Sequence, residues 1–357
     1  MRKPTSTNVS VLIPIYNAEK YLHQALESLR QQNSERLEFL CINDGSTDNS
    51  LEIVHEFAAQ DNRFKVISKE NSGYGVSMNL GIQKAAGCYI AIFEPDDYIE
   101  GQMYSDLYAM AEKQGFPDVV KSSYWSVDDS QNEVQRFRCG YWKRIKHKDS
   151  PFTIKEEPLL TRYHPSIWTA LYRKDFLQAN QICFKEVPGA GWVDNPFMME
   201  TLLKAQSIVY TDNAYYCYRD AHSDSSTANI ADMNMPVDRW LEMTEIMNQN
   251  SSAVTEELWS IHAYKAFHYL EYAKKAKYYD SNEWLNLAKK VLGKLDPVVV
   301  ANSKHLSHEQ KCEYERITKS TLPLWSDTAY KRMLLGEAFW KTRQNGLAFM
   351  LNRAKKQ

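Results

Sequence analysis

Three carboxylates stand within four positions of the sequence, in the segment Glu94-Pro95-Asp96-Asp97. Acids this close together repel one another and raise each other's pKa values unless a cation lies between them. A cluster that offers only oxygen ligands suits Mg²⁺ or Mn²⁺, which is usually shared with substrate phosphates. The alternative is a Pro-Asp-Asp turn with solvated acids. We favour the metal because the segment follows a wholly apolar run at 88–93.

A further acid, Asp44, lies in the polar segment 43–48, again directly after an apolar run. Two interpretations are open for its side chain. It caps the helix that follows, or it accepts a hydrogen bond from a nucleobase or a ribose. Ser46 or Thr47 would serve equally well as the helix cap, which leaves Asp44 available for a ligand.

The segment 71–75 contains two glycines, Gly73 and Gly75. It matches neither of the phosphate-binding patterns GxGxxG and GxxxxGK[ST], so the sequence disfavours a dinucleotide site and a P-loop. The glycines still permit a close approach of the backbone to a ligand and a helix N-terminus that is directed at phosphate.

The elements that must position these groups follow from the hydrophobic pattern. Short apolar, β-branched runs indicate strands that are buried on both faces. Stretches with helical spacing separate them, the first beginning after Asn17, a candidate N-cap. This alternation predicts an α/β fold with a mainly parallel sheet, in which ligands bind at the carboxyl ends of the strands. The predicted strands are residues 9–14, 37–42, 64–67, 88–93, 207–210 and 214–218.

After about residue 230 the strand pattern gives way to helical spacing of apolar residues. The first helical pattern involves Leu258, Ile261 and Leu270, and the next involves Trp284, Leu287 and Val291. A length of 357 residues suits two domains. We therefore predict an α/β domain of residues 1–230 and a helical C-terminal region of residues 231–357.

The composition excludes several classes of protein. With 43 basic and 45 acidic side chains the net charge is -2, which gives no support for a nucleic-acid partner. Six scattered cysteines without a CxxC pair fit reduced thiols. No signal peptide and no apolar run of the ~18 residues that span a bilayer is visible, so we expect a cytoplasmic protein. The aromatic content of 12% fits a core, a sugar-stacking surface or a membrane interface.

Four ordered segments together resemble the family-two glycosyltransferases of the GT-A fold. They are residues 11–19 (VLIPIYNAE), 42–48 (INDGSTD), 71–81 (NSGYGVSMNLG) and 94–97 (EPDD). The resemblance implies a Rossmann-like, mainly parallel sheet flanked by helices, followed here by the helical region. Residues 1–230 would be the catalytic domain of an inverting transferase that uses a nucleotide-diphosphate sugar, usually uridine-based. It would carry Mn²⁺ or Mg²⁺ on a DXD-like motif.

The resemblance also implies roles for individual residues. Asp96 would be the main metal ligand with Asp97, and Glu94 would lie near the diphosphate or the donor sugar, although the family has Asp at that first position. The remaining residues implied at the nucleotide-sugar site are Pro14, Tyr16, Glu19, Asp44, Gly75 and Asn79.

An inverting transfer needs one general base, which takes the proton from the acceptor hydroxyl. The family places this base in a later Glu-Asp segment that opens a helix. The similar segment here is 189–197, in which Asp194 is the only acid and Val193 replaces the usual Glu. Asp194 is therefore our predicted base, with a helix N-cap as its alternative role. Trp192 is predicted to stack on an acceptor or donor sugar, with packing as its alternative.

Residues 215–219 (YYCYR) resemble the family's Tyr-Tyr-Arg segment. Arg219 or His222 would neutralise charge on the departing nucleotide diphosphate. The alternative is a strand edge with a solvated loop.

Residues 331–357 carry seven basic side chains and one acid, Glu337, interleaved with Leu, Phe, Met and Trp. This composition is typical of a helix that lies on a membrane surface, which would place the protein at the inner face of the cell membrane. It equally suits a helix that docks on its own domain or on a second subunit of a homo-oligomer.

The leading hypothesis is thus a metal-dependent hexosyl- or N-acetylhexosaminyltransferase that extends a surface polysaccharide, a lipopolysaccharide or another glycoconjugate. Its acceptor would be a saccharide or a lipid-linked saccharide. One alternative is a nucleotidyltransferase that makes the activated sugar, although the segment 14–17 lacks the Gly-rich, basic loop of such enzymes. The other is a non-catalytic module that binds a nucleotide or a sugar.

Overall fold

The computed structural model describes residues 7–129, 134–219, 230 and 232–354, with side chains described through residue 344. The chain divides into two compact units. The α/β unit comprises residues 1–157 and 164–222, and the helical unit comprises residues 158–163 and 223–357. We describe each unit by itself.

Nine strands in the described part of the α/β unit form one sheet, in the order β3-β2-β1-β4-β8-β6-β9-β5, with β7 paired to β6. The first four strands in that order are parallel to one another. Every residue of β1, β2 and β4 is buried, as their apolar sequences predict. Their bounds are β1 (Val9–Ile15), β2 (Leu37–Asp44), β3 (Phe64–Lys69) and β4 (Tyr89–Ile92).

The other half of the sheet is mixed. β8 pairs antiparallel with both β4 and β6, whereas β9 runs parallel to β6. The two predicted strands at 207–218 are one strand, β9, which contains register shifts opposite Ser122 and Ser123. The bounds are β5 (Tyr98–Ile99), β6 (Val119–Asp128), β7 (Gln135–Arg138), β8 (Ala170–Arg173) and β9 (Ile208–Arg219).

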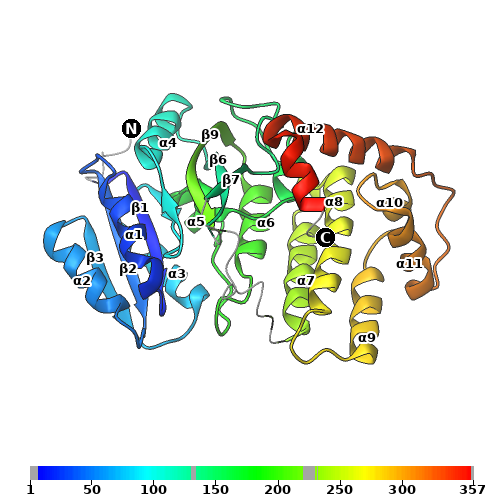
Figure 1. Cartoon of the computed structure of the whole chain (residues 1–357), viewed down its shortest axis with the longest axis horizontal. Coiled ribbons are helices and arrows are strands. Elements are labelled where there is room, and N and C mark those ends of the chain that lie inside the picture. Colours follow the sequence, from blue (N-terminus) through cyan, green and yellow to red (C-terminus); the bar gives the residue numbers. More distant parts are fainter. Residues whose placement is uncertain (1–6, 130–133, 220–229, 231, 355–357) are drawn as a thin grey trace. The chain divides into compact units, whose positions relative to one another are not determined.

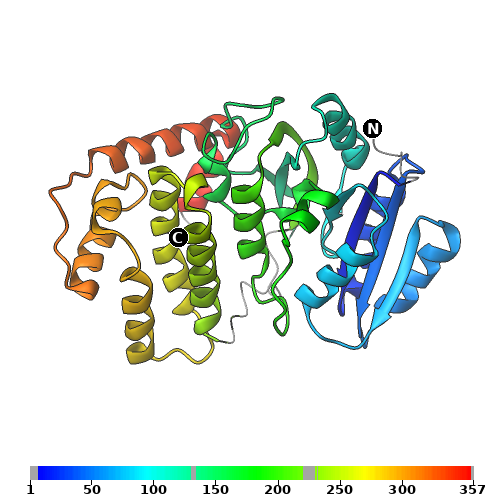
Figure 2. The ribbon, with the colours of Figure 1, turned by 180° about the vertical axis from the view of Figure 1, so that it is seen from behind.

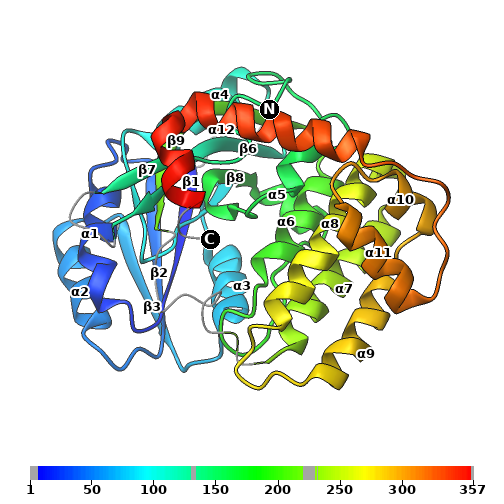
Figure 3. The same ribbon diagram turned by 45° about the vertical axis from the view of Figure 1, so that its right-hand side comes forward.

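Helices cover both faces of the parallel strands (Figure 1). α1 and α2 lie on one face, and α3 lies on the other (Figure 3). Right-handed crossovers require this arrangement, because the chain moves outward from β1 to β3 and then returns across the sheet to β4. The helices of this unit are α1 (Glu19–Arg30), α2 (Ser50–Gln60), α3 (Tyr74–Lys84), α4 (Met103–Lys113), the 3₁₀ helix η2 (Ile167–Thr169), α5 (Lys174–Ala179) and α6 (Asp194–Lys204).

The predicted N-cap at Asn17 is wrong. α1 begins at Glu19 with Ala18 in the N-cap position. Asn17 has a left-handed backbone, with a φ of 49°, and its Oδ1 accepts a hydrogen bond from Thr47 N at 2.8 Å. Its amide therefore joins the loops that follow β1 and β2 instead of starting a helix.

The helical unit contains the two helices that the apolar spacing predicts, α8 and α9. α7 and α8 run side by side (Figure 2), and the indole of Trp240 stacks on His262 between them at 4.5 Å. No helix in the described residues is long and apolar enough to cross a membrane. The elements are η1 (Pro158–Thr161), α7 (Asn234–Gln249), η3 (Ser251–Ala253), α8 (Glu256–Ala273), α9 (Ser281–Leu292), α10 (Pro297–Asn302), α11 (His308–Thr318) and α12 (Thr328–Ala354).

The predicted fold class, an α/β sheet with flanking helices followed by a helical region, is confirmed. The assignment of residues 1–230 as catalytic and of 231–357 as an accessory region stays a prediction.

Candidate functional site

The acidic segment follows β4 and closes into a tight turn, in which Asp97 N donates to the carbonyl oxygen of Glu94 at 3.2 Å. The next two residues form β5, which pairs with β9. From β9, the hydroxyl oxygen of Tyr216 accepts a hydrogen bond from Glu94 N at 3.1 Å, and Arg219 N donates to Asp97 Oδ1 at 2.8 Å. A strand from far along the sequence therefore holds the backbone that carries the three carboxylates.

Glu94 is half-buried, and its Oε1 accepts a 2.7 Å hydrogen bond from the hydroxyl of Tyr74. Burial raises the pKa of Glu94 to about 8, and the negative charges of Asp96 and Asp194 act in the same direction, against the hydrogen bond from Tyr74. Glu94 therefore holds a proton through much of the neutral range unless a positive charge lies nearby.

Asp97 and Asp96 differ in exposure. Asp97 is only 1% exposed, and its pKa lies well above the usual range because of burial and the charge of Asp96, against hydrogen bonds from Arg219 N and the Tyr216 hydroxyl. Asp96 is half-buried. That both residues ligate a metal stays a prediction, and Asp96 is the more accessible of the two.

Asp194 is the first residue of α6, and Val193 occupies the N-cap position. The alternative role of Asp194 as the N-cap is therefore wrong, although an acid in the first turn is favourable to the helix dipole. Asp194 Oδ1 accepts a hydrogen bond from Asn195 Nδ2 at 3.1 Å. The carboxylate is near enough to the acidic turn for its charge to raise the pKa values of Glu94 and Tyr74.

The first turn of α3 is covered by the chain segment 184–189, which leads into α6. Tyr74 N donates to the carbonyl oxygen of Gly189 at 3.0 Å. The amide of Asn79 exchanges two hydrogen bonds with the backbone of Phe184, at 2.8 and 2.9 Å. A Cβ on Gly75 would lie 2.0 Å from the carbonyl oxygen of Lys185. Gly75 and Asn79 thus hold this segment, while their predicted contact with a donor stays a prediction.

Asp44 is buried, and both of its carboxylate oxygens bind backbone N–H groups. Oδ1 accepts from Ser72 N and Oδ2 from Gly73 N, each at 2.9 Å, and Lys69 forms an ion pair with the same carboxylate. α2 begins at Ser50 behind Asn49, so the helix-cap interpretation of Asp44 is wrong. Asp44 instead shapes the turn that precedes α3, and its contact with a nucleobase stays a prediction.

The three predicted site residues around β1 are placed differently. Pro14 is buried in the strand opposite Ile42. The carboxylate of Glu19 accepts hydrogen bonds from the backbone N and the side-chain amide of Asn49, at 3.0 and 2.7 Å, and so holds the start of α2. Tyr16 is 53% exposed at the carboxyl end of β1. Of the three, Tyr16 offers the surface that a planar ligand needs.

The guanidinium of Arg219 is buried within the framework of the site. It forms an ion pair with Asp129 at 2.8 Å and donates to the carbonyl oxygen of Asp96. It also lies over the rings of Tyr21 and Tyr98, each at 4.9 Å. These contacts hold the acidic turn in place. His222, the alternative group for the leaving diphosphate, lies outside the described residues.

Trp192 is 9% exposed and has a left-handed backbone, with a φ of 54°. Its carbonyl oxygen accepts a hydrogen bond from Asn195 N at 3.2 Å. This residue therefore turns the chain into α6 immediately before Asp194. Its predicted contact with a sugar stays a prediction.

Three aromatic residues near the acidic turn were not predicted as site residues, Tyr74, Tyr216 and Trp168. The hydroxyl of Tyr216 contacts the turn, and its ring stacks on Trp168 of η2 at 4.0 Å. The cluster 215–218 was visible in the sequence. No local pattern tells which of its rings faces the acids, because that depends on the pairing of β9 with β5.

Comparison with known proteins assigns the family. The model of glycosyl transferase family 2 matches residues 10–179. Glycosyltransferase GlyG of Streptococcus pneumoniae serotype 4 is 30% identical over 216 residues, which cover 59% of this chain and 70% of GlyG. The chain belongs to glycosyl transferase family 2. Another relative, the putative glycosyltransferase EpsH of Bacillus subtilis, is 31% identical over 216 residues, and the match spans about three fifths of its length, 60%.

The structure of Staphylococcus aureus TarS 1-349 in complex with UDP-GlcNAc has a similar fold. The TM-score is 0.66 at 21% sequence identity, with 91% of this chain and 92% of the TarS chain covered. The expected GT-A fold is thereby confirmed, and the likeness extends through the helical unit.

The carboxylates of the candidate site fit a divalent cation only in part. In the described residues no three His, Cys, Asp or Glu side chains are close enough to hold a metal by themselves. Asp96 is half-buried, like Glu94, whose pKa is raised first by burial and then by the negative charge of Asp96. One or two carboxylates that leave the other positions to phosphate oxygens and water are the usual arrangement for Mg²⁺. The donor set therefore fits a metal that arrives with the nucleotide.

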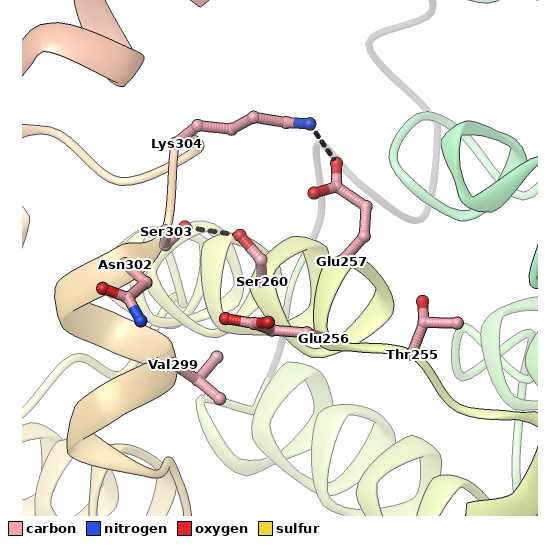
Figure 4. Close-up of a pocket in the computed structure, with 8 residues that line it drawn as sticks. All are labelled: Thr255, Glu256, Glu257, Ser260, Val299, Asn302, Ser303 and Lys304. Carbon is pink, nitrogen blue, oxygen red and sulfur yellow. Dashed lines mark hydrogen bonds and ion pairs between the residues drawn. The ribbon is translucent and has the colours of Figure 1, made fainter.

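A pocket of about 350 Å³ lies in the helical unit, away from these acids in the sequence (Figure 4). Its polar groups bind mainly to each other. Ser260 Oγ donates to Ser303 Oγ at 2.8 Å, and Glu257 forms an ion pair with Lys304 at 2.8 Å and a hydrogen bond with His305 Nε2 at 2.9 Å. This pocket is therefore a packing feature between α8 and α10, and we do not assign the family's chemistry to it.

Proposed function

We propose that the protein transfers a sugar from a nucleotide-diphosphate sugar to a hydroxyl of a saccharide or glycolipid acceptor, with inversion at the anomeric carbon. One observation carries the proposal. Tyr74 N donates to the carbonyl oxygen of Gly189 at 3.0 Å, in the segment that leads to Asp194 at the start of α6, and the hydroxyl of Tyr74 donates to Glu94, just after β4, at 2.7 Å. A base on one side and acids for a diphosphate on the other are what a single displacement requires.

The donor that we propose is a UDP-linked hexose or N-acetylhexosamine. A protein with a similar fold, TarS, was solved with UDP-GlcNAc. In this chain, the exposed ring of Tyr16 stands at the end of β1, and the turn at 71–73 is held by Asp44. Tyr16 supplies a flat apolar face for a base, since aromatic rings stack well on nucleobases.

In the proposed reaction, the acceptor oxygen attacks the anomeric carbon while the bond from that carbon to the diphosphate oxygen breaks. Asp194 accepts the proton of the acceptor hydroxyl, and the nucleotide diphosphate departs with the bonding electron pair. Asn79 and Gly75 hold the segment that leads to Asp194, so the base is positioned from the same loop system that would bind the donor.

Asp96, together with its neighbours Glu94 and Asp97, would hold Mn²⁺ or Mg²⁺ along with the diphosphate. When bound, such a cation neutralises the charge of the departing diphosphate. Arg219 positions Asp96 by binding its backbone carbonyl oxygen. Tyr74 orients Glu94 through its hydroxyl.

The acceptor that we propose is a growing surface glycan, free or linked to lipid. The decisive test screens UDP-sugars with Mn²⁺ for transfer to saccharide acceptors and identifies the released nucleotide and the anomeric configuration of the product. Release of UDP with an inverted linkage is the expected result. Release of pyrophosphate from a nucleoside triphosphate and a sugar phosphate would instead identify a nucleotidyltransferase.

Calorimetry of UDP binding separates the metal from the chemistry. We expect UDP affinity to rise with Mn²⁺ and to lose that rise in Asp96→Asn. Asp149→Asn is the matched control, because Asp149 is exposed and has a left-handed backbone that Asn tolerates. UDP binding that is indifferent to Mn²⁺ and to Asp96→Asn would contradict the assignment of the acids.

A further inference from the structure

The long helix α12 has a buried face that is fixed by an acid. Glu337 accepts hydrogen bonds from Arg162 at 2.9 Å and from the hydroxyl of Tyr163 at 3.1 Å. The Arg162 and Glu337 side chains are about nine-tenths buried, and Arg162 also donates to Met333 Sδ at 3.4 Å. The only acid of residues 331–357 thus points into the helical unit and is neutralised there.

The opposite face of α12 carries cations and apolar side chains. We call this face the outer face of α12. Leu335 and Phe339, one helical turn apart, are 71% and 70% exposed. The exposed charged residues on the described part of this face are Lys331, Arg332 and Arg343.

The order of these residues around the helix is that of an interfacial helix. At 100° per residue, Leu335 and Phe339 lie near the centre of the outer face, with Lys331 and Arg332 on either side of them. The middle of this face is apolar, and long basic side chains lie at its margins. Such a face suits a surface that is apolar inside and anionic at its boundary.

The charge on the outer face argues against a second copy of this chain as the occupant. Symmetric pairing through this face would place the same cations against one another, and in the described residues the face has no acid to compensate them. Like charges in apposition oppose association. An anionic surface has the complementary charge.

We propose that the outer face of α12 binds the surface of an anionic lipid bilayer, with Leu335 and Phe339 inserted among the acyl chains. Lys331, Arg332 and Arg343 then lie at the level of the lipid phosphates. This interaction is separate from the proposed glycosyl transfer, since no residue of the candidate site takes part in it. The sequence left open whether this helix docks on its own domain, on a second subunit or on a membrane. In this proposal the face with Glu337 packs on the helical unit, and the outer face binds the membrane.

The test is sedimentation of the full chain with vesicles of phosphatidylcholine alone or of phosphatidylcholine with phosphatidylglycerol. We expect binding to the anionic vesicles that weakens with added salt. The double variant R332Q/R343Q is expected to lower the partition coefficient roughly 30-fold, on the scale of basic residues at anionic surfaces. The variant L335Q/F339Q is expected to lower it at least about tenfold through lost apolar burial.

The matched control is K289Q/K290Q, which removes two exposed cations from α9 in the same unit. Circular dichroism and thermal unfolding establish that each variant is folded. The proposal is overturned if the wild-type chain ignores anionic vesicles, or if R332Q/R343Q has no larger effect than the control. It is also overturned if the chain, without lipid, forms a dimer that L335Q/F339Q abolishes, because a second copy then covers this face.

Discussion

The hydroxyl of Tyr74 donates a 2.7 Å hydrogen bond to Glu94 Oε1, and this bond joins the start of α3 to the end of β4. The ring of Tyr74 packs edge-on against Phe184 at 5.8 Å, within the segment that leads to Asp194. One side chain therefore connects the acidic turn with the chain that carries the proposed base.

Tyr74→Phe tests this connection, because it keeps the ring and removes the hydroxyl. A typical hydrogen bond contributes about 0.5–1.5 kcal/mol, so we expect kcat/KM to fall roughly 2–10-fold. Steady-state kinetics with the identified donor measure the effect. Tyr89→Phe is the control, since it removes a 2.7 Å hydrogen bond to the Pro117 carbonyl elsewhere in the unit. An equal loss in both variants would mean that only folding is affected.

Asp194→Asn tests the general base. The amide keeps the size and shape of the side chain at the start of α6 but cannot accept the acceptor's proton. General bases typically contribute 10²–10⁴-fold, so we expect a loss of roughly that size in kcat with donor affinity unchanged. Glu200→Gln, which removes another acid from α6, should retain activity. Normal turnover by Asp194→Asn would require a different base.

The parallel half of the fold could be predicted from the sequence because each strand there has a clear apolar pattern of its own. Residues 9–15 and 37–42 are mainly apolar, with Ser10 and Glu38 as the exceptions, and a helix with clear apolar spacing separates them. The sequence predicts two strands within residues 207–218, whereas the structure has the single strand β9. The register shifts in β9 interrupt the apolar pattern by which a continuous strand is predicted.

The members of the candidate site could be predicted, but not their contacts. Glu94 and Asp44 could be predicted as site residues because each follows a parallel strand, and the carboxyl ends of parallel strands lie at one edge of the sheet. The binding of Asp44 to Ser72 N and Gly73 N depends on how a loop folds back. The hydrogen bond from Glu94 N to the hydroxyl oxygen of Tyr216 depends on strand pairing across 122 positions of sequence. Neither contact has a local signature.

Gly75→Ala tests whether the crossing of α3 and the segment 184–189 requires glycine. A Cβ at position 75 would lie 2.0 Å from the Lys185 carbonyl oxygen, which is backbone and cannot rotate away. We expect a loss of about 1–3 kcal/mol in unfolding free energy, measured by urea denaturation. Gly336→Ala is the control, because a Cβ there meets nothing within 4 Å, and it should gain about 0.5–1 kcal/mol from helix propensity. Unchanged stability in Gly75→Ala would show that the segment yields easily.

Lys121 of β6 is a buried cation in the core of the α/β unit. Its ammonium donates to Ser166 O at 2.6 Å and to the hydroxyl of Thr169 at 2.7 Å, and it lies 5.9 Å from the ring of Tyr141. Burial lowers the pKa of Lys121 to about 7, with the nearby Cys139 thiol acting weakly in the opposite direction. The unfolded chain, with a Lys pKa near 10.4, binds this proton more tightly.

Lys121 should therefore make the α/β unit more stable as the pH rises from about 7 toward 10, because in that window the unfolded state holds a proton that the folded state has lost. One proton corresponds to at most about 1.4 kcal/mol per pH unit. We expect Lys121→Met to flatten this dependence in urea denaturation at several pH values. Lys65→Met is the control, since Lys65 is 52% exposed and pairs with Glu38. A wild-type curve that does not rise more steeply than that of Lys121→Met would mean that Lys121 stays charged in the folded protein.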